Sequence, residues 1–364
     1  MPSLARKGRG AVTNPGIRYE TTRTELQDDG WGTLAAEFAD LPPLPTTLTR
    51  EHARSALSWN DSPDIGFDRS LNPYRGCEHG CIYCYARPAH AYVGMSPGLD
   101  FETRLMFKPN LPELLEKELS RPGYVAKPVA LGANTDPYQP VERTLGITRR
   151  VLEVLERFGH PVTIVTKGAL VLRDLDILKR LAERNLVHVC LSITTLDMKL
   201  ARAMEPRAAN PLKRLAAVTE LAKAGIPVGV LAAPMIPALN DMELERILEA
   251  SARAGASRAG YVLLRLPLEI KEMFEAWLAE HHPDRAARVL ALVRETRGGR
   301  LYDARFGQRQ TGTGPYAELM AQRFRIALRR YGLGGRGTGG GMSEGLDCSQ
   351  FQPPRAPARQ LELL

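Results

Sequence analysis

The sequence has few cysteines and no long apolar run. Five cysteines in 364 residues exclude a disulfide-stabilised scaffold. The longest uncharged apolar run, Ile226–Leu239, has 14 residues and three prolines, so it is too short and too interrupted to cross a bilayer. No apolar stretch follows the basic start MPSLARKGRG, and we therefore expect no signal peptide. These absences predict a soluble cytoplasmic protein in a reducing compartment.

The composition is that of a folded globular protein. Apolar residues make up 44% of the chain and charged residues 25%, which excludes disorder throughout, a collagen-like chain and a coiled coil. The length allows two or three domains, although an α/β barrel often exceeds 200 residues as one domain.

The net charge of +8 is concentrated near the C-terminus. The segment Asp284–Arg330 holds 11 arginines, no lysine and four acidic residues, a net charge of +7. A patch of one sign attracts phosphate-bearing partners, so nucleic acid is one hypothesis for this segment. The alternative is that these arginines pair with carboxylates elsewhere in the fold.

The two ends of the chain lack the features of a packed core. Residues 1–60 show no convincing periodicity, and the stretch from Leu333 onward is rich in glycine and then in proline, which predicts a flexible tail. We therefore divide the chain into an N-terminal extension, a core barrel, an Arg-rich helical or lid segment and a tail, at residues 1–60, 61–283, 284–332 and 333–364.

Short β-branched apolar runs recur through the middle of the chain. Most are continuous rather than alternating, as in parallel strands that are covered on both faces. The expected strands are Val129–Ala133, Val162–Thr166, Val187–Ile193, Val228–Ala233 and Tyr261–Leu264, with a sixth around Asp68–Arg75.

Amphipathic stretches separate these runs. Val151, Leu152, Leu155 and Phe158 share one helical face, and Gly159 ends that helix. The other expected helices are Leu175–Arg184, Leu212–Ala224 and Met242–Arg253. Repeated βα units predict an α/β fold, a partial (βα)6 barrel of the TIM type, with a doubly wound sheet as the alternative. Both folds place their chemistry at the carboxyl ends of the strands.

Three cysteines form a C-x3-C-x2-C cluster. Cys77, Cys81 and Cys84 lie within eight residues, and crowded thiolates suit zinc or an iron–sulfur cluster. Zinc usually needs a fourth ligand, which His79 or His90 could supply, but there is no second CxxC pair. Two alternatives thus remain beside an enzyme: an iron–sulfur redox or sensing protein, and a zinc-stabilised nucleic-acid-binding module.

The cluster, with an aromatic residue before its last cysteine, resembles the signature of the radical S-adenosylmethionine (SAM) superfamily. The longer stretches GCEHGCIYCYARP, TDPYQPVE and PMIPALND resemble the spore photoproduct lyase-like branch, in particular its bacterial members of unassigned substrate that are often labelled DNA-repair-photolyase-like. The resemblance covers roughly residues 68–307, by the βα pattern.

This resemblance implies a partial (βα)6 barrel and a [4Fe–4S] cluster whose open iron binds the amino and carboxylate groups of SAM. Reductive cleavage of SAM would yield methionine and a 5′-deoxyadenosyl radical that takes hydrogen from a substrate. The electron would come from a donor such as flavodoxin or ferredoxin.

The resemblance also implies site residues. Thr135, Lys167 and Ser192, each at the carboxyl end of an expected strand, would contact SAM. Tyr83 and Tyr85 would contact SAM and relay hydrogen, or would pack over the cysteine loop and exclude solvent.

Three charged residues are further candidates for the SAM site. Asp136 would bind the SAM amino group or cap a helix that begins near Val141. Glu205 and Arg207, which bracket a proline, would clamp SAM or substrate, or form a structural salt bridge.

One departure from the family pattern concerns the hydrogen-donor cysteine of true spore photoproduct lyases. The stretch Leu131–Asp136, where that residue is expected, contains no cysteine, which argues against thymine-dimer repair. Cys190 shares a strand face with Ser192, as a core residue or a redox residue. Cys348 lies in the tail, either folded back over the barrel mouth or as a free thiol without a role.

Overall fold

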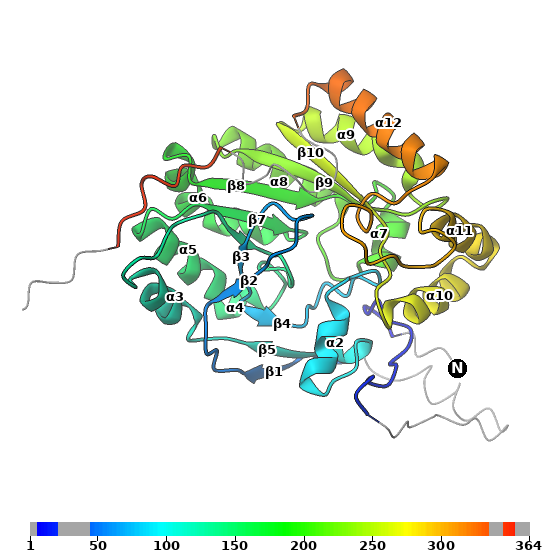
Figure 1. Ribbon diagram of the computed structural model, residues 1–364, viewed down its shortest axis with the longest axis horizontal. Helices are drawn as coiled ribbons and strands as arrows, with labels where there is room; N and C mark the ends of the chain where they lie inside the picture. The colour runs from blue at the N-terminus through cyan, green and yellow to red at the C-terminus, as the bar shows by residue number, and fades with distance from the viewer. Residues whose placement is uncertain (1–5, 21–43, 335–344, 354–364) are drawn as a thin grey trace, which may run out of the picture.

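The computed structural model describes residues 6–20, 44–334 and 345–353. Its main sheet has seven strands in the order β10-β9-β8-β7-β6-β3-β2 (Figure 1). Neighbours from β3 to β10 are parallel, and β2 joins the edge antiparallel. The parallel strands follow chain order without a reversal, as in a partial barrel and unlike a doubly wound sheet. The α/β partial barrel is therefore confirmed.

The observed strands of the main sheet agree closely with the apolar runs of the sequence. The run Val162–Thr166 and strand β7 begin and end at the same residues. The other strands are β2 (Leu57–Trp59), β3 (Arg69–Leu71), β6 (Val129–Leu131), β8 (Val187–Ser192), β9 (Val228–Met235) and β10 (Arg258–Leu263).

The stretch Asp68–Arg75 does not form a single strand. Its first part is β3, whereas β4 (Tyr74–Arg75) pairs antiparallel with β5 (Arg104–Phe107). β5 also pairs in parallel with β1 (Thr47–Arg50), which gives a separate three-stranded sheet. The cysteine loop follows β4 directly, and the Cys77 amide donates to the Phe101 carbonyl just before β5.

The outer helices include those expected from periodicity. The helix expected from about Val141 is divided at Gly146, whose φ of 61° is the left-handed conformation that glycine adopts readily. The α-helices of the barrel are α2 (Leu99–Thr103), α3 (Leu111–Leu119), α4 (Glu142–Leu145), α5 (Ile147–Arg157), α6 (Leu175–Glu183), α7 (Met198–Met204), α8 (Pro211–Lys223) and α9 (Leu244–Arg253), and the 3-10 helices are η1 (Arg87–Val93), η2 (Ala169–Asp174) and η3 (Asp241–Glu243). Within the described ranges, no helix combines the length and apolar character that crossing a bilayer requires.

The region expected as an N-terminal extension contributes to the fold. It supplies β1 and β2, and its residues Arg9–Val12 are buried. The backbone amides of Gly10 and Ala11 donate to the carboxylate of Glu102 at 2.9 and 2.8 Å. Residues 1–5 and 21–43 lie outside the described ranges.

Three helices follow the barrel: α10 (Ile270–His281), α11 (Pro283–Glu295) and α12 (Pro315–Tyr331). The domain boundary expected after residue 283 falls at the start of α11, which packs against α10, while α12 packs on α9 and β10 (Figure 1). The Arg-rich segment is therefore helical in part and continuous with the barrel.

The described part of the tail lies at the end of the barrel where the strands begin. The amides of Asp347 and Gln352 donate to the carbonyls of Asn185 and Phe158, which precede β8 and β7, and the ring of Phe351 packs against that of Phe158. Cys348 is thus not at the barrel mouth. The tail residues 335–344 and 354–364 lie outside the described ranges.

Candidate functional site

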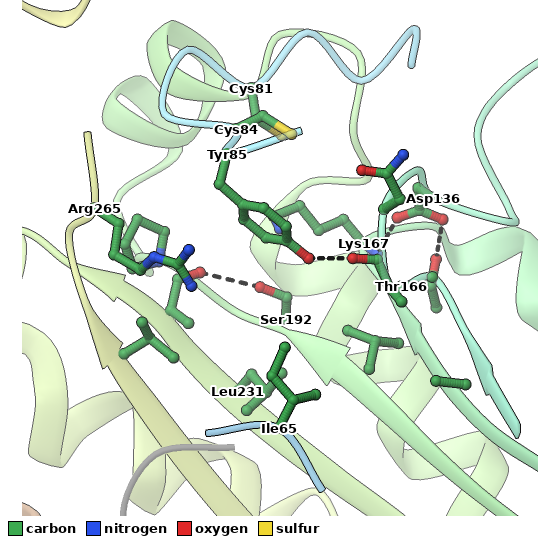
Figure 2. A pocket seen from close by; sticks show the side chains of 18 of the residues that line it. Ile65, Cys81, Cys84, Tyr85, Asp136, Thr166, Lys167, Ser192, Leu231 and Arg265 are labelled. Carbon is green, nitrogen blue, oxygen red and sulfur yellow. Dashed lines mark hydrogen bonds between the residues drawn. The ribbon is translucent and has the colours of Figure 1, made fainter. Parts of the chain in front are cut away.

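A cavity of about 360 Å³ occupies the barrel where the parallel strands end (Figure 2). Residues at or just past the carboxyl ends of β6 to β10 line its wall, and the cysteine loop covers one side. This is where a barrel of parallel strands carries its chemistry, because loops from different strands converge there.

All three cysteines of the loop line this cavity. Cys77 and Cys81 are buried and Cys84 is half-buried. Burial raises the pKa of the Cys77 thiol, and the nearby Asp136, Cys81 and Cys84 raise it further, so the three sulfurs lie close enough to interact. Three soft donors on one short loop fit an iron–sulfur cluster with one iron left for a non-protein ligand.

The histidines considered as zinc ligands have other contacts. His79 pairs with Asp136 at 3.2 Å, and His90 Nε2 lies 3.0 Å from the Arg104 carbonyl. Among the residues that the structure describes, no three His, Cys, Asp or Glu side chains surround a single point as one metal ion would require. A cluster binds each thiolate at a different iron and has no such requirement.

Two side chains that the sequence did not identify as supports hold the cysteine loop. Gln139 accepts a hydrogen bond from the Glu78 amide at 2.9 Å and donates to the Gly76 carbonyl at 3.2 Å. Arg87 donates to the carbonyls of Cys81 and Gly80 at 2.8 and 3.0 Å. Gln139 lies about 60 residues from Gly76 and Glu78 in the sequence, so no local pattern indicates its contacts with the loop.

Asp136 is a carboxylate in the cavity wall whose side chain is 11% exposed. It accepts hydrogen bonds from the Thr166 hydroxyl at 2.6 Å and the Lys167 amide at 2.7 Å, in addition to the contact with His79. Burial raises the pKa of Asp136, but His79 and these hydrogen bonds outweigh it and bring the pKa to about 2. Asp136 thus connects the cysteine loop to the end of β7.

Lys167 and Ser192 line the cavity, whereas Thr135 does not. The Lys167 ammonium lies 5.7 Å from the centre of the Tyr83 ring, and the Ser192 hydroxyl donates to the Ala233 carbonyl at 3.1 Å. The Thr135 hydroxyl donates to the Tyr74 carbonyl at 3.0 Å. Its neighbour Asn134 lines the cavity instead.

Glu205 and Arg207 do not pair with each other, and neither lines this cavity. Arg207 pairs with Glu78 at 3.0 Å. Glu205 is buried, pairs with Arg214 and accepts a hydrogen bond from the Tyr83 hydroxyl. The predicted salt bridge between Glu205 and Arg207 is therefore wrong, because each of the two residues pairs with a different partner.

Tyr85 extends from the cysteine loop into the cavity (Figure 2). Its hydroxyl donates to the Ala133 carbonyl, and the Arg265 guanidinium lies 5.3 Å from the centre of its ring. Arg265 follows β10 and was missed in the sequence, because a single arginine after a strand carries no distinctive signal.

Cys190 occupies β8 between Val165 of β7 and Gly229 of β9. It is fully buried and is not among the residues that line the cavity, although Ser192 on the same strand is. Burial raises the pKa of the Cys190 thiol, which keeps it neutral.

Several arginines of the segment Asp284–Arg330 pair with carboxylates. Arg309 lines the cavity and pairs with Asp64 at 2.7 Å, which connects this segment to the loop before β3. Further ion pairs are Arg285–Asp284, Arg294–Glu275, Arg305–Asp303 and Arg323–Glu245. These pairs favour the structural interpretation for the residues involved, and nucleic-acid binding by this segment stays a prediction.

Comparison with known sequences identifies the family. A family model described as the radical SAM superfamily matches residues 71–250. An uncharacterized protein of Mycobacterium tuberculosis is 35% identical over 273 residues, which are 74% of this chain and 76% of that protein. An uncharacterized protein of Methanocaldococcus jannaschii is 29% identical over 173 residues, 48% of this chain and 62% of that protein.

Comparison with solved structures concerns the fold. Spore photoproduct lyase complexed with dinucleoside spore photoproduct matches with a TM-score of 0.56 and 16% identity, covering 79% of this chain and 80% of that chain. A mutant of spore photoproduct lyase with bound AdoMet and dinucleoside spore photoproduct matches with a TM-score of 0.50 and 16% identity, covering 80% and 84%. At this level of identity the likeness shows a shared fold.

Proposed function

This chain belongs to the radical SAM superfamily, and we propose that it takes a hydrogen atom from an organic substrate by means of SAM and a [4Fe–4S] cluster. The observation that carries the proposal is the gathering of three cysteine thiols, Lys167 and Asp136 in one cavity at the carboxyl ends of the strands. The cluster, reduced by one electron, would supply the cleavage of SAM to methionine and a 5′-deoxyadenosyl radical.

The protein's own part in this reaction is to bind and orient. Cys77, Cys81 and Cys84 would hold the cluster, and Gln139 with Arg87 would keep their loop in place through the contacts described above. Lys167 suits the SAM carboxylate, because its ammonium lies in the cavity and a charge-assisted hydrogen bond is strong there.

Tyr85 is the better candidate for contact with the reacting groups. Its hydroxyl lies beside the Ala133 carbonyl in the cavity wall, whereas the hydroxyl of Tyr83 donates to the buried Glu205. We therefore assign Tyr83 to positioning and keep Tyr85 as the candidate for contact with SAM and hydrogen transfer.

The electron is proposed to come from a small redox protein such as flavodoxin or ferredoxin. Nucleic acid remains one proposed substrate class, supported only by the charge of the segment Asp284–Arg330.

The test is formation of 5′-deoxyadenosine. Anaerobically reconstituted protein, given dithionite and SAM without substrate, is expected to release 5′-deoxyadenosine slowly, because cleavage requires only reduced cluster and bound SAM. Cys81→Ala should release none, while the control Cys348→Ala, altered far from the cavity, should match the wild type. A cluster-loaded wild type that forms no 5′-deoxyadenosine would contradict the proposal.

A further inference from the structure

Arg265 is a cation in the cavity wall that has no acidic partner among the residues that the structure describes. Its side chain lines the cavity just after β10, and its Nε is buried without a hydrogen-bond acceptor. Its guanidinium lies over the Tyr85 ring, 5.3 Å from the ring centre. A buried guanidinium donor without an acceptor costs free energy, so this position calls for an oxygen ligand.

The other arginines on this side of the barrel have acceptors. Arg309 pairs with Asp64 at 2.7 Å. Arg297 is buried and donates to the carbonyls of Leu263 and Leu264 at 3.2 and 2.8 Å. The Nε of Arg297 also lacks an acceptor, but its other two nitrogens donate to carbonyls. Arg265 differs because, within the described residues, none of its nitrogens donates to a protein acceptor.

The charge around Arg265 favours an anion. Burial lowers the pKa of Arg297 to about 10, and the charge of Arg265 is the next largest cause. The two guanidinium groups are thus close enough to repel each other, while Asp303 offsets this only in part. A bound oxyanion at Arg265 would relieve the repulsion.

The stack on Tyr85 leaves the donors of Arg265 available. A cation–π contact is an attraction between the charge and the face of the ring, and it uses none of the hydrogen-bond donors of the guanidinium. Those donors match the oxygen spacing of a carboxylate or a phosphate. The stack therefore orients Arg265 without using its hydrogen-bonding capacity.

Lys167 is the second cation of this site (Figure 2). Both cations line the cavity, and within the described residues neither pairs with a carboxylate; each lies over a tyrosine ring instead. Two cations that lie at two different tyrosine rings and that no carboxylate neutralises can serve two different anions. SAM has a single carboxylate, for which Lys167 is the candidate.

We propose that Arg265 binds an oxyanion of the substrate, a phosphate or a carboxylate, at the part of the cavity wall beside the Tyr85 ring. The proposal rests on the proposed function, because it assigns Lys167 to SAM. It adds a substrate class: a molecule whose reacting carbon lies within reach of an anionic group.

The experiment measures anion binding without turnover. Inorganic phosphate and acetate are titrated separately, by ligand-observed NMR, into anaerobic cluster-containing protein that is saturated with SAM. The variants are Arg265→Gln, Arg265→Lys and the control Arg288→Gln, which removes the same charge from an exposed position of α11. The two probes distinguish a phosphate site from a carboxylate site.

We expect one of the two anions to bind the wild type and Arg288→Gln equally. Binding should weaken tenfold or more in Arg265→Gln, as expected for a charge-assisted hydrogen bond, and less in Arg265→Lys, which keeps the charge. The SAM affinity of Arg265→Gln should stay within twofold of the wild type.

Three results would overturn the proposal: neither anion binds the wild type, Arg265→Gln binds the anion as well as the wild type does, or Arg265→Gln loses SAM affinity. The last result would make Arg265 a SAM ligand. Failure of the proposed function is distinguishable, because it would appear as the absence of 5′-deoxyadenosine from the wild type, whatever the anion titrations give.

Discussion

The buried ion pair between Glu205 and Arg214 gives the sharpest test of how the site is built. The two side chains are only 1% and 2% exposed, so neutralising Glu205 leaves the Arg214 charge in the interior. Removal of one partner of such a pair typically costs about 3–5 kcal/mol. Arg214 keeps its hydrogen bonds to the Ala209 and Ser192 carbonyls at 2.6 and 2.9 Å, so we expect the lower end for Glu205→Gln, about 3 kcal/mol.

The assay is urea denaturation of the cluster-containing protein under anaerobic conditions, followed by tryptophan fluorescence, with a parallel SAM titration. The control is Glu249→Gln, whose partner Arg253 is 79% exposed; that variant should lose less than about 1 kcal/mol. The double variant Glu205→Gln/Arg214→Met should recover most of the loss, because it removes both buried charges.

The reasoning predicts a loss of stability and little direct effect on SAM binding in Glu205→Gln. A variant that kept the wild-type free energy of unfolding but bound SAM many times more weakly would refute it. Glu205 would then contact the cofactor, and its position outside the cavity wall would describe only the protein without SAM.

Other expected results concern the cavity and the Arg-rich segment. Lys167→Ala should weaken SAM binding by about 1.5–3 kcal/mol through loss of a charge-assisted contact, as measured by calorimetry. The control Lys199→Ala, on the exposed surface, should bind SAM like the wild type. Equal SAM affinities of Lys167→Ala and the wild type would show that Lys167 is not part of the SAM site. Alanine replacement of any one cysteine of the loop should abolish the iron–sulfur absorption, and Cys348→Ala should retain it; a full cluster in a loop variant would show that the ligand set is wrong. Arg309→Gln should lower the thermal midpoint, because it leaves Asp64 without its partner in a partly buried contact; an unchanged midpoint together with a flatter salt dependence of DNA or RNA binding would instead support the nucleic-acid hypothesis.

Local pattern predicted the strands of the barrel and the cysteine loop, while the strand order of the structure decided between a partial barrel and a doubly wound sheet. A continuous apolar run such as Val162–Thr166 is β7 from end to end, because a strand covered on both faces needs apolar side chains at every position. The C-x3-C-x2-C spacing likewise indicates three donors on one short loop, since residues so close in sequence remain close in any fold. The positions of Lys167 and Ser192 at strand ends follow from the same local reasoning.

Tertiary structure alone decided which charged groups meet. Glu205 pairs with Arg214 instead of the nearer Arg207, because the turn at Pro206 directs the two side chains to different neighbours. Arg309 meets Asp64 across 245 residues of sequence, a contact that exists only because the chain returns to the first strand after completing the barrel. The contact of Arg265 with Tyr85 has the same origin. Arg265 follows β10 and Tyr85 lies in the cysteine loop after β4, and these two segments meet only when the barrel forms, so no periodicity in the sequence indicates their contact.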